Sequence, residues 1–110
     1  MRTLQFIVDG QIVKQDPACD FSDLVPGSEG YLQAEFSFSP QWKNTVRAVT
    51  FYSMMGREYG AEILKDGKTC KIPAEALKKR AFKIKVTGRG RDDFKISTDK
   101  VTVVQNGGKT

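Results

Sequence analysis

The chain has no histidine, only two cysteines and a single tryptophan among its 110 residues. Without histidine it lacks the commonest general base, and neither Cys19 nor Cys70 has an evident activating partner. Fifty residues separate the two cysteines and no other soft ligand flanks them, which excludes a zinc-binding spacing and a small disulfide scaffold. We expect two free, mostly buried thiols, with a single bridge between them as the alternative. We expect neither an enzyme nor a bound metal or other cofactor.

Long apolar runs are absent as well. No segment approaches the about 18 consecutive apolar residues of a membrane-spanning helix, and the first residues do not make a signal peptide. Neither membrane insertion nor secretion by a signal peptide is therefore expected. With 39% apolar and 28% charged residues, the chain is too apolar and too evenly mixed to be disordered. We predict one folded domain over residues 1–105 and a flexible tail over residues 106–110.

The clearest pattern in the sequence is the alternation that follows Tyr31. Apolar and polar residues alternate there with a period of two, which predicts a strand whose buried face carries Leu32, Ala34, Phe36 and Phe38. Pro40 removes a donor of the strand ladder and ends the strand, and Trp42 follows at once. The bulky indole is therefore expected to close one end of the core.

Turn residues and shorter alternations predict the remaining elements. Asp-Gly pairs at 9–10 and 66–67 lie between apolar runs and indicate hairpins. Residues 73–80 begin with proline and end with three basic residues, which predicts one or two helical turns that cross between sheets. The inward parity changes near residues 98–100, where we expect a bulge or a short turn. About eight short strands predict an all-β fold, an antiparallel, immunoglobulin-like β-sandwich, with a small barrel as the alternative.

The predicted core lies between the two sheets. Its large apolar side chains are Phe36, Phe38, Trp42, Phe51, Ile63, Ile72, Phe82, Ile84 and Val86. Phe94, which follows the loop over residues 88–93, is also assigned to the core. The connector over residues 18–30 is rich in turn residues, and we expect Phe21 and Leu24 to anchor it to the core.

The net charge is +5, and the basic residues cluster late in the chain. The candidate basic patch consists of Lys79, Arg80, Lys83, Lys85, Arg89 and Arg91, and its positive potential would suit a nucleic acid. The alternative is a solvated strand face, because Lys83 and Lys85 alternate with apolar residues.

A turn over residues 53–57 carries two adjacent methionines. Exposed methionines can mark a contact surface, so Met54, Met55 and Arg57 form the candidate partner surface. The alternative is a flexible loop that fills a gap in the packing.

Two blocks of the sequence carry a family resemblance. The first reads Phe-x-Phe-Ser-Pro-x-Trp from Phe36 to Trp42, and the second reads Cys-x-Ile-Pro-x-Glu-x-Leu from Cys70 to Leu77. Together with Gly10, Gln11, Phe51, Phe82, Val86, Gly88 and Thr98, they resemble small structural proteins encoded in phages and prophages of Gram-positive bacteria. They are similar to the N-terminal β-sandwich domain of baseplate upper proteins, whose relatives build tails and baseplates. The resemblance implies a β-sandwich made in the bacterial cytoplasm and placed in the virion, without an active site.

Three functions follow as expectations. The first is a non-enzymatic virion structural or assembly module of a tail, baseplate or capsid, which contacts other phage structural proteins or copies of itself. The second is a basic nucleic-acid-binding small β-barrel that uses Arg89, Arg91 and residues 78–85. The third is glycan binding through exposed aromatic side chains such as Tyr31, Tyr52 or Tyr59.

Overall fold

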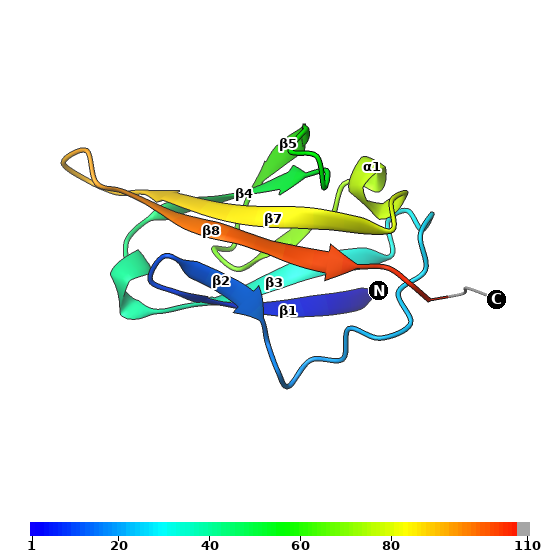
Figure 1. Cartoon of the computed structure of the whole chain (residues 1–110). Coiled ribbons are helices and arrows are strands. Elements are labelled where there is room, and N and C mark those ends of the chain that lie inside the picture. Colours follow the sequence, from blue (N-terminus) through cyan, green and yellow to red (C-terminus); the bar gives the residue numbers. More distant parts are fainter. Residues whose placement is uncertain (108–110) are drawn as a thin grey trace.

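The protein folds into two four-stranded β-sheets that pack face to face, and the computed structural model describes residues 1–107 (Figure 1). The first sheet has the order β2-β1-β3-β6 and consists of β1 (Arg2–Asp9), β2 (Ile12–Gln15), β3 (Leu32–Phe38) and β6 (Thr69–Lys71). The second has the order β5-β4-β7-β8 and consists of β4 (Val46–Tyr52), β5 (Glu58–Ile63), β7 (Ala81–Arg89) and β8 (Lys95–Val104). These eight strands confirm the predicted all-β sandwich.

The sheets are not antiparallel throughout, because β1 and β3 run parallel with Phe6 opposite Phe36. The two phenyl rings stack with their centroids 5.2 Å apart. A parallel neighbour requires a long crossover, and residues 16–31 supply it by carrying the chain from the end of β2 to the level at which β1 begins. There the Arg2 N–H donates to the Tyr31 carbonyl at 2.8 Å. The prediction of an antiparallel sandwich is therefore wrong for this pair of strands and correct for the others.

The two Asp-Gly pairs have different outcomes. The first joins β1 to β2 as an antiparallel hairpin, with Asp9 opposite Ile12 and Gly10 at a φ of +58°, as predicted. The second is not a hairpin, because β5 lies in the second sheet and β6 in the first. The Asp66 carboxylate accepts the Lys68 and Thr69 N–H groups at 2.9 and 2.7 Å and so fixes the corner at which the chain changes sheets. These bonds and that of the Thr69 hydroxyl, the largest cause, lower the pKa of Asp66 to about 2.

The core follows the alternation of the strands. Of the side chains predicted to be buried, seven are at most 4% exposed, namely Phe36, Trp42, Phe51, Ile72, Phe82, Ile84 and Val86. Phe38 is only half-buried at the edge of this core. Ile63 is 61% exposed, contrary to the prediction, because it lies opposite Ala48 on the outer face of the second sheet, and Leu64 is buried instead. Phe94 is 46% exposed rather than buried, because it lies in the loop before β8.

A bulge in β8 links the two sheets along one side. Val86 lies between residues paired with Ser97 and Lys100, so Thr98 and Asp99 both face it, which confirms the predicted bulge. The Thr98 hydroxyl accepts the Val86 N–H at 3.0 Å, and this pair is buried. The Asp99 carboxylate accepts the Val13 N–H at 3.0 Å, so β2 of the first sheet is tied to β8 of the second. The edge strands β2 and β8 therefore cover each other on this side of the sandwich.

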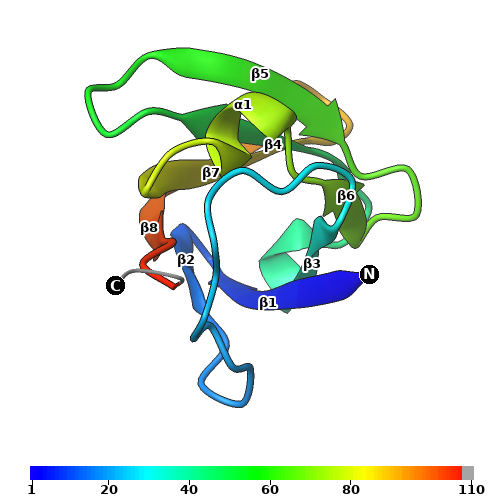
Figure 2. The ribbon, with the colours of Figure 1, turned by 90° about the vertical axis from the view of Figure 1, so that its right-hand side faces the viewer.

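The end of the sandwich that carries the short helix is closed by the connector. The helix α1 (Ala74–Leu77) crosses from β6 to β7, as predicted, and no helix among residues 1–107 is long and apolar enough to span a membrane. Leu24 of the connector is buried, and the Gly27 N–H donates to the Leu77 carbonyl at 2.7 Å. The fully buried Gln105 amide donates to the carbonyls of Leu77 and Lys79 at 3.0 and 2.8 Å. The connector and the segment after β8 therefore together hold the end of α1 and the residues that follow it (Figure 2).

The predicted C-terminal tail begins just beyond Gln105. The Gly107 N–H donates to the Leu24 carbonyl at 2.8 Å, so the chain still touches the connector at this point. Residues 108–110 of the predicted tail lie outside the described residues.

The opposite end of the sandwich is closed by Trp42, as predicted. The indole is fully buried, and its N–H donates to the Gly10 carbonyl of the β1–β2 hairpin at 2.7 Å. A Cβ atom on Gly88 of β7 would lie only 2.7 Å from the Trp42 ring, so only glycine leaves room for the indole there. Arg47 donates to the Trp42 carbonyl at 2.8 Å and stacks over the Phe38 ring at 4.0 Å.

The tight packing at this end makes Gly88→Ala a direct test of the fold. The added methyl must displace an indole that is held by its hydrogen bond to Gly10, and such overpacking costs about 1–3 kcal/mol of unfolding free energy. Urea unfolding followed by the fluorescence of Trp42, the only tryptophan, measures this loss directly. Thr87→Ala at the neighbouring position, whose side chain points away from the core, should change the midpoint little. An equal stability of the two variants would contradict the packing described here.

Candidate functional site

A groove lies between the β4–β5 turn and the residues around α1, and we call it the methionine groove. It holds about 760 Å³ of open space and is lined by Ser53, Met54, Met55, Arg57, Tyr59, Glu75, Lys78, Lys79, Arg80 and Ala81. The register of the second sheet creates it. Tyr52 at the end of β4 pairs with Lys83 near the start of β7, so the residues that follow β4 lie beside those that precede β7.

One wall of the groove is a tight turn. The Ser53 hydroxyl accepts the N–H groups of Met55 and Arg57 at 3.2 and 2.9 Å, and the Ser53 N–H donates to the Arg57 carbonyl at 2.7 Å. Gly56 takes a φ of +93°, which a residue with a side chain rarely adopts. With the backbone held inward, the side chains of Met54 and Met55 point outward and are 47% and 95% exposed.

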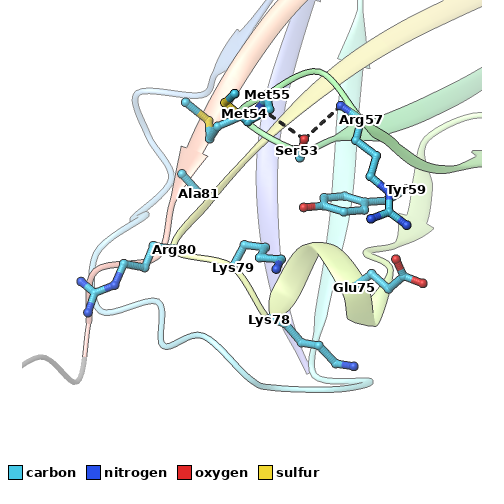
Figure 3. A pocket seen from close by; sticks show the side chains of 10 residues that line it. All are labelled: Ser53, Met54, Met55, Arg57, Tyr59, Glu75, Lys78, Lys79, Arg80 and Ala81. Carbon is cyan, nitrogen blue, oxygen red and sulfur yellow. Dashed lines mark hydrogen bonds between the residues drawn. The ribbon is translucent and has the colours of Figure 1, made fainter.

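The other wall is α1 and the segment that leads from it into β7. The N–H groups of Lys78 and Lys79 donate to helix carbonyls at 3.1 and 3.2 Å. The Gln105 amide donates to the Lys79 carbonyl of the same segment. The Tyr59 ring, half-buried against the core, lies between the two walls. In Figure 3 the side chains of Arg57 and Lys79 extend toward the middle of the groove, whereas those of Lys78 and Arg80 extend away from it.

The charges around the groove are strongly unequal. Four exposed cationic side chains line it, and Glu75 is the only carboxylate among its lining residues. Met54, Met55 and Ala81 add apolar lining, and the Ser53 hydroxyl is already occupied by the turn that it stabilises. This combination can bind an apolar segment that carries negative charge, and it positions no nucleophile next to a base.

The groove brings together residues of two predicted sites. Met54, Met55 and Arg57 of the candidate partner surface lie across from Lys79 and Arg80 of the candidate basic patch. Glu75, Lys78 and Tyr59 also line the groove, although the sequence analysis did not assign them to it. The only signal that could have placed them there is the pairing of β4 with β7, because this pairing sets which turn lies beside the helix.

The remaining members of the predicted basic patch lie elsewhere. Lys83, Lys85 and Arg89 alternate along the outer face of the second sheet, and Arg91 lies in the loop beyond β7. On the same face, Lys100 of β8 pairs with Lys85, and Lys95 pairs with Arg89. The predicted patch is therefore divided between the groove and a basic sheet face that includes two lysines of β8.

The three tyrosines do not form one platform. Tyr31 is 52% exposed at the end of the connector, and Tyr59 lies in the methionine groove. The Tyr52 ring lies on the outer face of the second sheet beneath the Lys100 ammonium, 4.0 Å from its centroid. A glycan could therefore meet only one of these rings at a time.

Both cysteines are free, as expected. Cys70 points into the sandwich opposite Ala34, and burial, together with the Glu62 and Asp66 carboxylates, raises the pKa of its thiol to about 12. Cys19 lies in the connector, where its sulfur accepts the Gln5 N–H at 3.4 Å. Within residues 1–107, no group of three or more potential ligand side chains is placed to hold a metal ion.

Searches of known protein families, of curated proteins and of solved structures find no match to this chain.

The environment of the two thiols predicts a difference in reactivity. In the folded protein at neutral pH, iodoacetamide should modify Cys19 well before Cys70, because only thiolates react and the raised pKa of Cys70 keeps it protonated. Both should react once the protein is unfolded in urea. Mass spectrometry of the alkylated peptides measures the two rates, with Cys19→Ser and Cys70→Ser as matched controls. Equal rates in the folded protein, or an intact disulfide, would contradict this assignment.

Proposed function

We propose that the protein is a non-enzymatic structural or assembly module of a phage virion and that it acts through protein–protein contacts at the methionine groove. The observation that carries this proposal is the exposure of Met54 and Met55 on a hydrogen-bonded turn at the edge of a groove that four cationic side chains line. Exposed apolar surface rimmed by polar residues is typical of protein interaction sites. Methionine suits such a site because its unbranched, polarizable side chain adapts to the shape of a partner.

The phage setting is supported by the resemblance of two sequence blocks to phage structural proteins. Both blocks have structural roles that fit a rigid module. The segment from Phe36 to Trp42 closes one end of the sandwich, and the segment from Cys70 to Leu77 forms β6, the crossover and α1 at the other. We infer that the partners are other structural proteins of the phage and that the place of action is the virion, after synthesis in the host cytoplasm.

Incorporation into particles tests this function. The wild-type protein, supplied from a plasmid to a phage that lacks its own copy, should remain with the particles through density-gradient purification. A variant with Met54→Ser and Met55→Asp should lose most of this incorporation, because it replaces the apolar wall with a carboxylate. Quantitative immunoblotting of the purified particles measures both proteins.

Val46→Asp is the matched control. Val46 is 69% exposed at the opposite end of β4, so the substitution makes a similar apolar-to-acidic change far from the groove. It should leave incorporation unchanged. A wild-type protein that never accompanies the particles, or a groove variant that enters them as efficiently as the Val46 variant, would refute the proposal.

A nucleic-acid-binding function is the second candidate, and the basic sheet face favours it. Lys83, Lys85 and Arg89 lie on this face beside Lys95 and Lys100. Such a face can follow a phosphate backbone, and the Tyr52 ring offers one surface for stacking a base. The ring is already covered by the Lys100 ammonium, which makes this candidate weaker than the first.

An electrophoretic shift assay tests the second candidate. If the sheet face binds nucleic acid, a labelled single-stranded oligonucleotide should shift at low salt, and the shift should weaken as salt rises. A variant with Lys83→Glu and Lys85→Glu should abolish the shift, whereas one with Arg57→Glu and Lys79→Glu, of equal net charge, should preserve it. No shift of the wild-type protein at low salt would eliminate this function.

A further inference from the structure

Acidic and basic residues are distributed unevenly along the chain. Residues 1–45 contain three basic and six acidic residues, whereas residues 46–110 contain fifteen basic and seven acidic ones. The connector over residues 16–31 contains Asp16, Asp20, Asp23 and Glu29 and no lysine or arginine. An acidic connector and a basic groove therefore belong to the same molecule.

The first part of the connector, residues 16–23, forms an acidic tip. Pro17 and Ala18 are exposed and lie between Asp16 and Asp20 in the chain, and we call these two residues the apex of the tip. The Asp16 carboxylate accepts the Ala18 N–H at 2.9 Å, and the Asp20 carboxylate accepts the Ser22 N–H at 2.8 Å. The Ser22 hydroxyl, followed by the Ser22 N–H, lowers the pKa of Asp20, so this carboxyl is ionised at neutral pH. The tip presents a small apolar apex flanked by negative charge.

The tip is held on the far side of the sandwich from the groove. The Arg2 guanidinium donates to the carbonyls of Asp20 and Ser22 at 2.9 and 2.7 Å. The Phe21 ring packs edge-on against Phe6 of β1 with the centroids 5.4 Å apart. In Figures 1 and 2 the loop after β2 extends away from α1 and from the β4–β5 turn. The acidic tip therefore cannot reach the groove of its own chain.

We propose that the methionine groove binds the acidic tip of a second copy of this chain, so that the molecules associate head to tail. The two surfaces match in chemistry, because the apex of Pro17 and Ala18 meets the apolar wall of Met54 and Met55. The flanking carboxylates of the tip meet Arg57 and Lys79, the two cations that extend into the groove. This inference rests on the proposed function and names the groove's partner.

The contact is heterologous, since it joins two different surfaces. After the first contact one molecule still has a free tip and the other still has a free groove, so the association continues into a ring or a filament. Because the surfaces are exposed and oppositely charged, the association should weaken as salt rises.

A charge-swap experiment tests the proposal with the purified chain. The groove variant carries Arg57→Glu and Lys79→Glu, and the tip variant carries Ala18→Lys and Asp20→Lys. Light scattering across a concentration series at low salt should show association of the wild-type protein and monomers for each variant alone. An equimolar mixture of the two variants should associate again, because every contact then joins opposite charges. A chain that carries all four substitutions should also associate by itself.

Controls separate this result from misfolding and from a general charge effect. The Lys83→Glu and Lys85→Glu variant changes the net charge as much as the groove variant, but it should associate like the wild-type protein. Circular dichroism must show the same β-sheet spectrum for all chains. A wild-type protein that stays monomeric at every concentration, or a mixture of folded variants that stays monomeric, would overturn the proposal.

The head-to-tail contact and the virion function can fail independently. If the wild-type protein and the mixture of variants associate but the wild-type protein never enters particles, the head-to-tail contact stands and the virion function falls. If it enters particles but remains monomeric in solution, and the tip variant enters as well, the groove serves another phage protein and the head-to-tail contact is refuted.

Discussion

The burial of Trp42 between the sheets is the constraint on which the rest of the structure depends. Its indole N–H bonds to Gly10 in the first sheet's hairpin, and its ring lies against Gly88 in the second sheet. Arg47, near the start of β4, bonds to the Trp42 carbonyl. Trp42 therefore fixes both the first residues of β4 and the last residues of β7. Because these strands are paired along their whole length, the register set here extends to their opposite ends, where the groove is formed.

Much of the fold could be predicted from the sequence because strand alternation is local. Inward parity is visible in residues 32–38 and 81–87 without knowledge of their neighbours, and the short crossover at 73–80 carries its own proline and charge signals. The choice of neighbouring strand is not local. The pairing of β1 with β3 depends on a connector that closes a distance of many residues, and Asp66 and Gly67 can turn a chain within one sheet or between two. Ile63 and Leu64 illustrate the same limit, since either could point inward until the pairing of β5 with β4 decides.

The candidate site was predictable in parts but not as a whole. The exposure of Met54 and Met55 follows from a turn with glycine at its end, and the positive charge at residues 78–80 is evident in the sequence. Their proximity depends on the opposition of Tyr52 and Lys83 across two strands and on Gln105, which holds the segment after α1. Gln105 lies beyond the last strand and has no sequence signal for this role. A polar residue near a chain end normally suggests solvent, yet this one is fully buried.

The placement of the groove and the acidic tip also bears on how the module can assemble. Side chains fix the backbone of both by hydrogen bonds, Ser53 in the turn of the groove and Asp16 and Arg2 in the tip, so association should cost little backbone entropy. The methionine side chains remain free to adapt, which allows a modest contact to fit without exact complementarity in advance. The separation of positive and negative charge across the sandwich orients approaching copies before they touch. Since each copy presents opposite charges on opposite sides, like surfaces repel and a symmetric face-to-face dimer through either surface is disfavoured. Directional growth is then the form of assembly most compatible with this charge distribution.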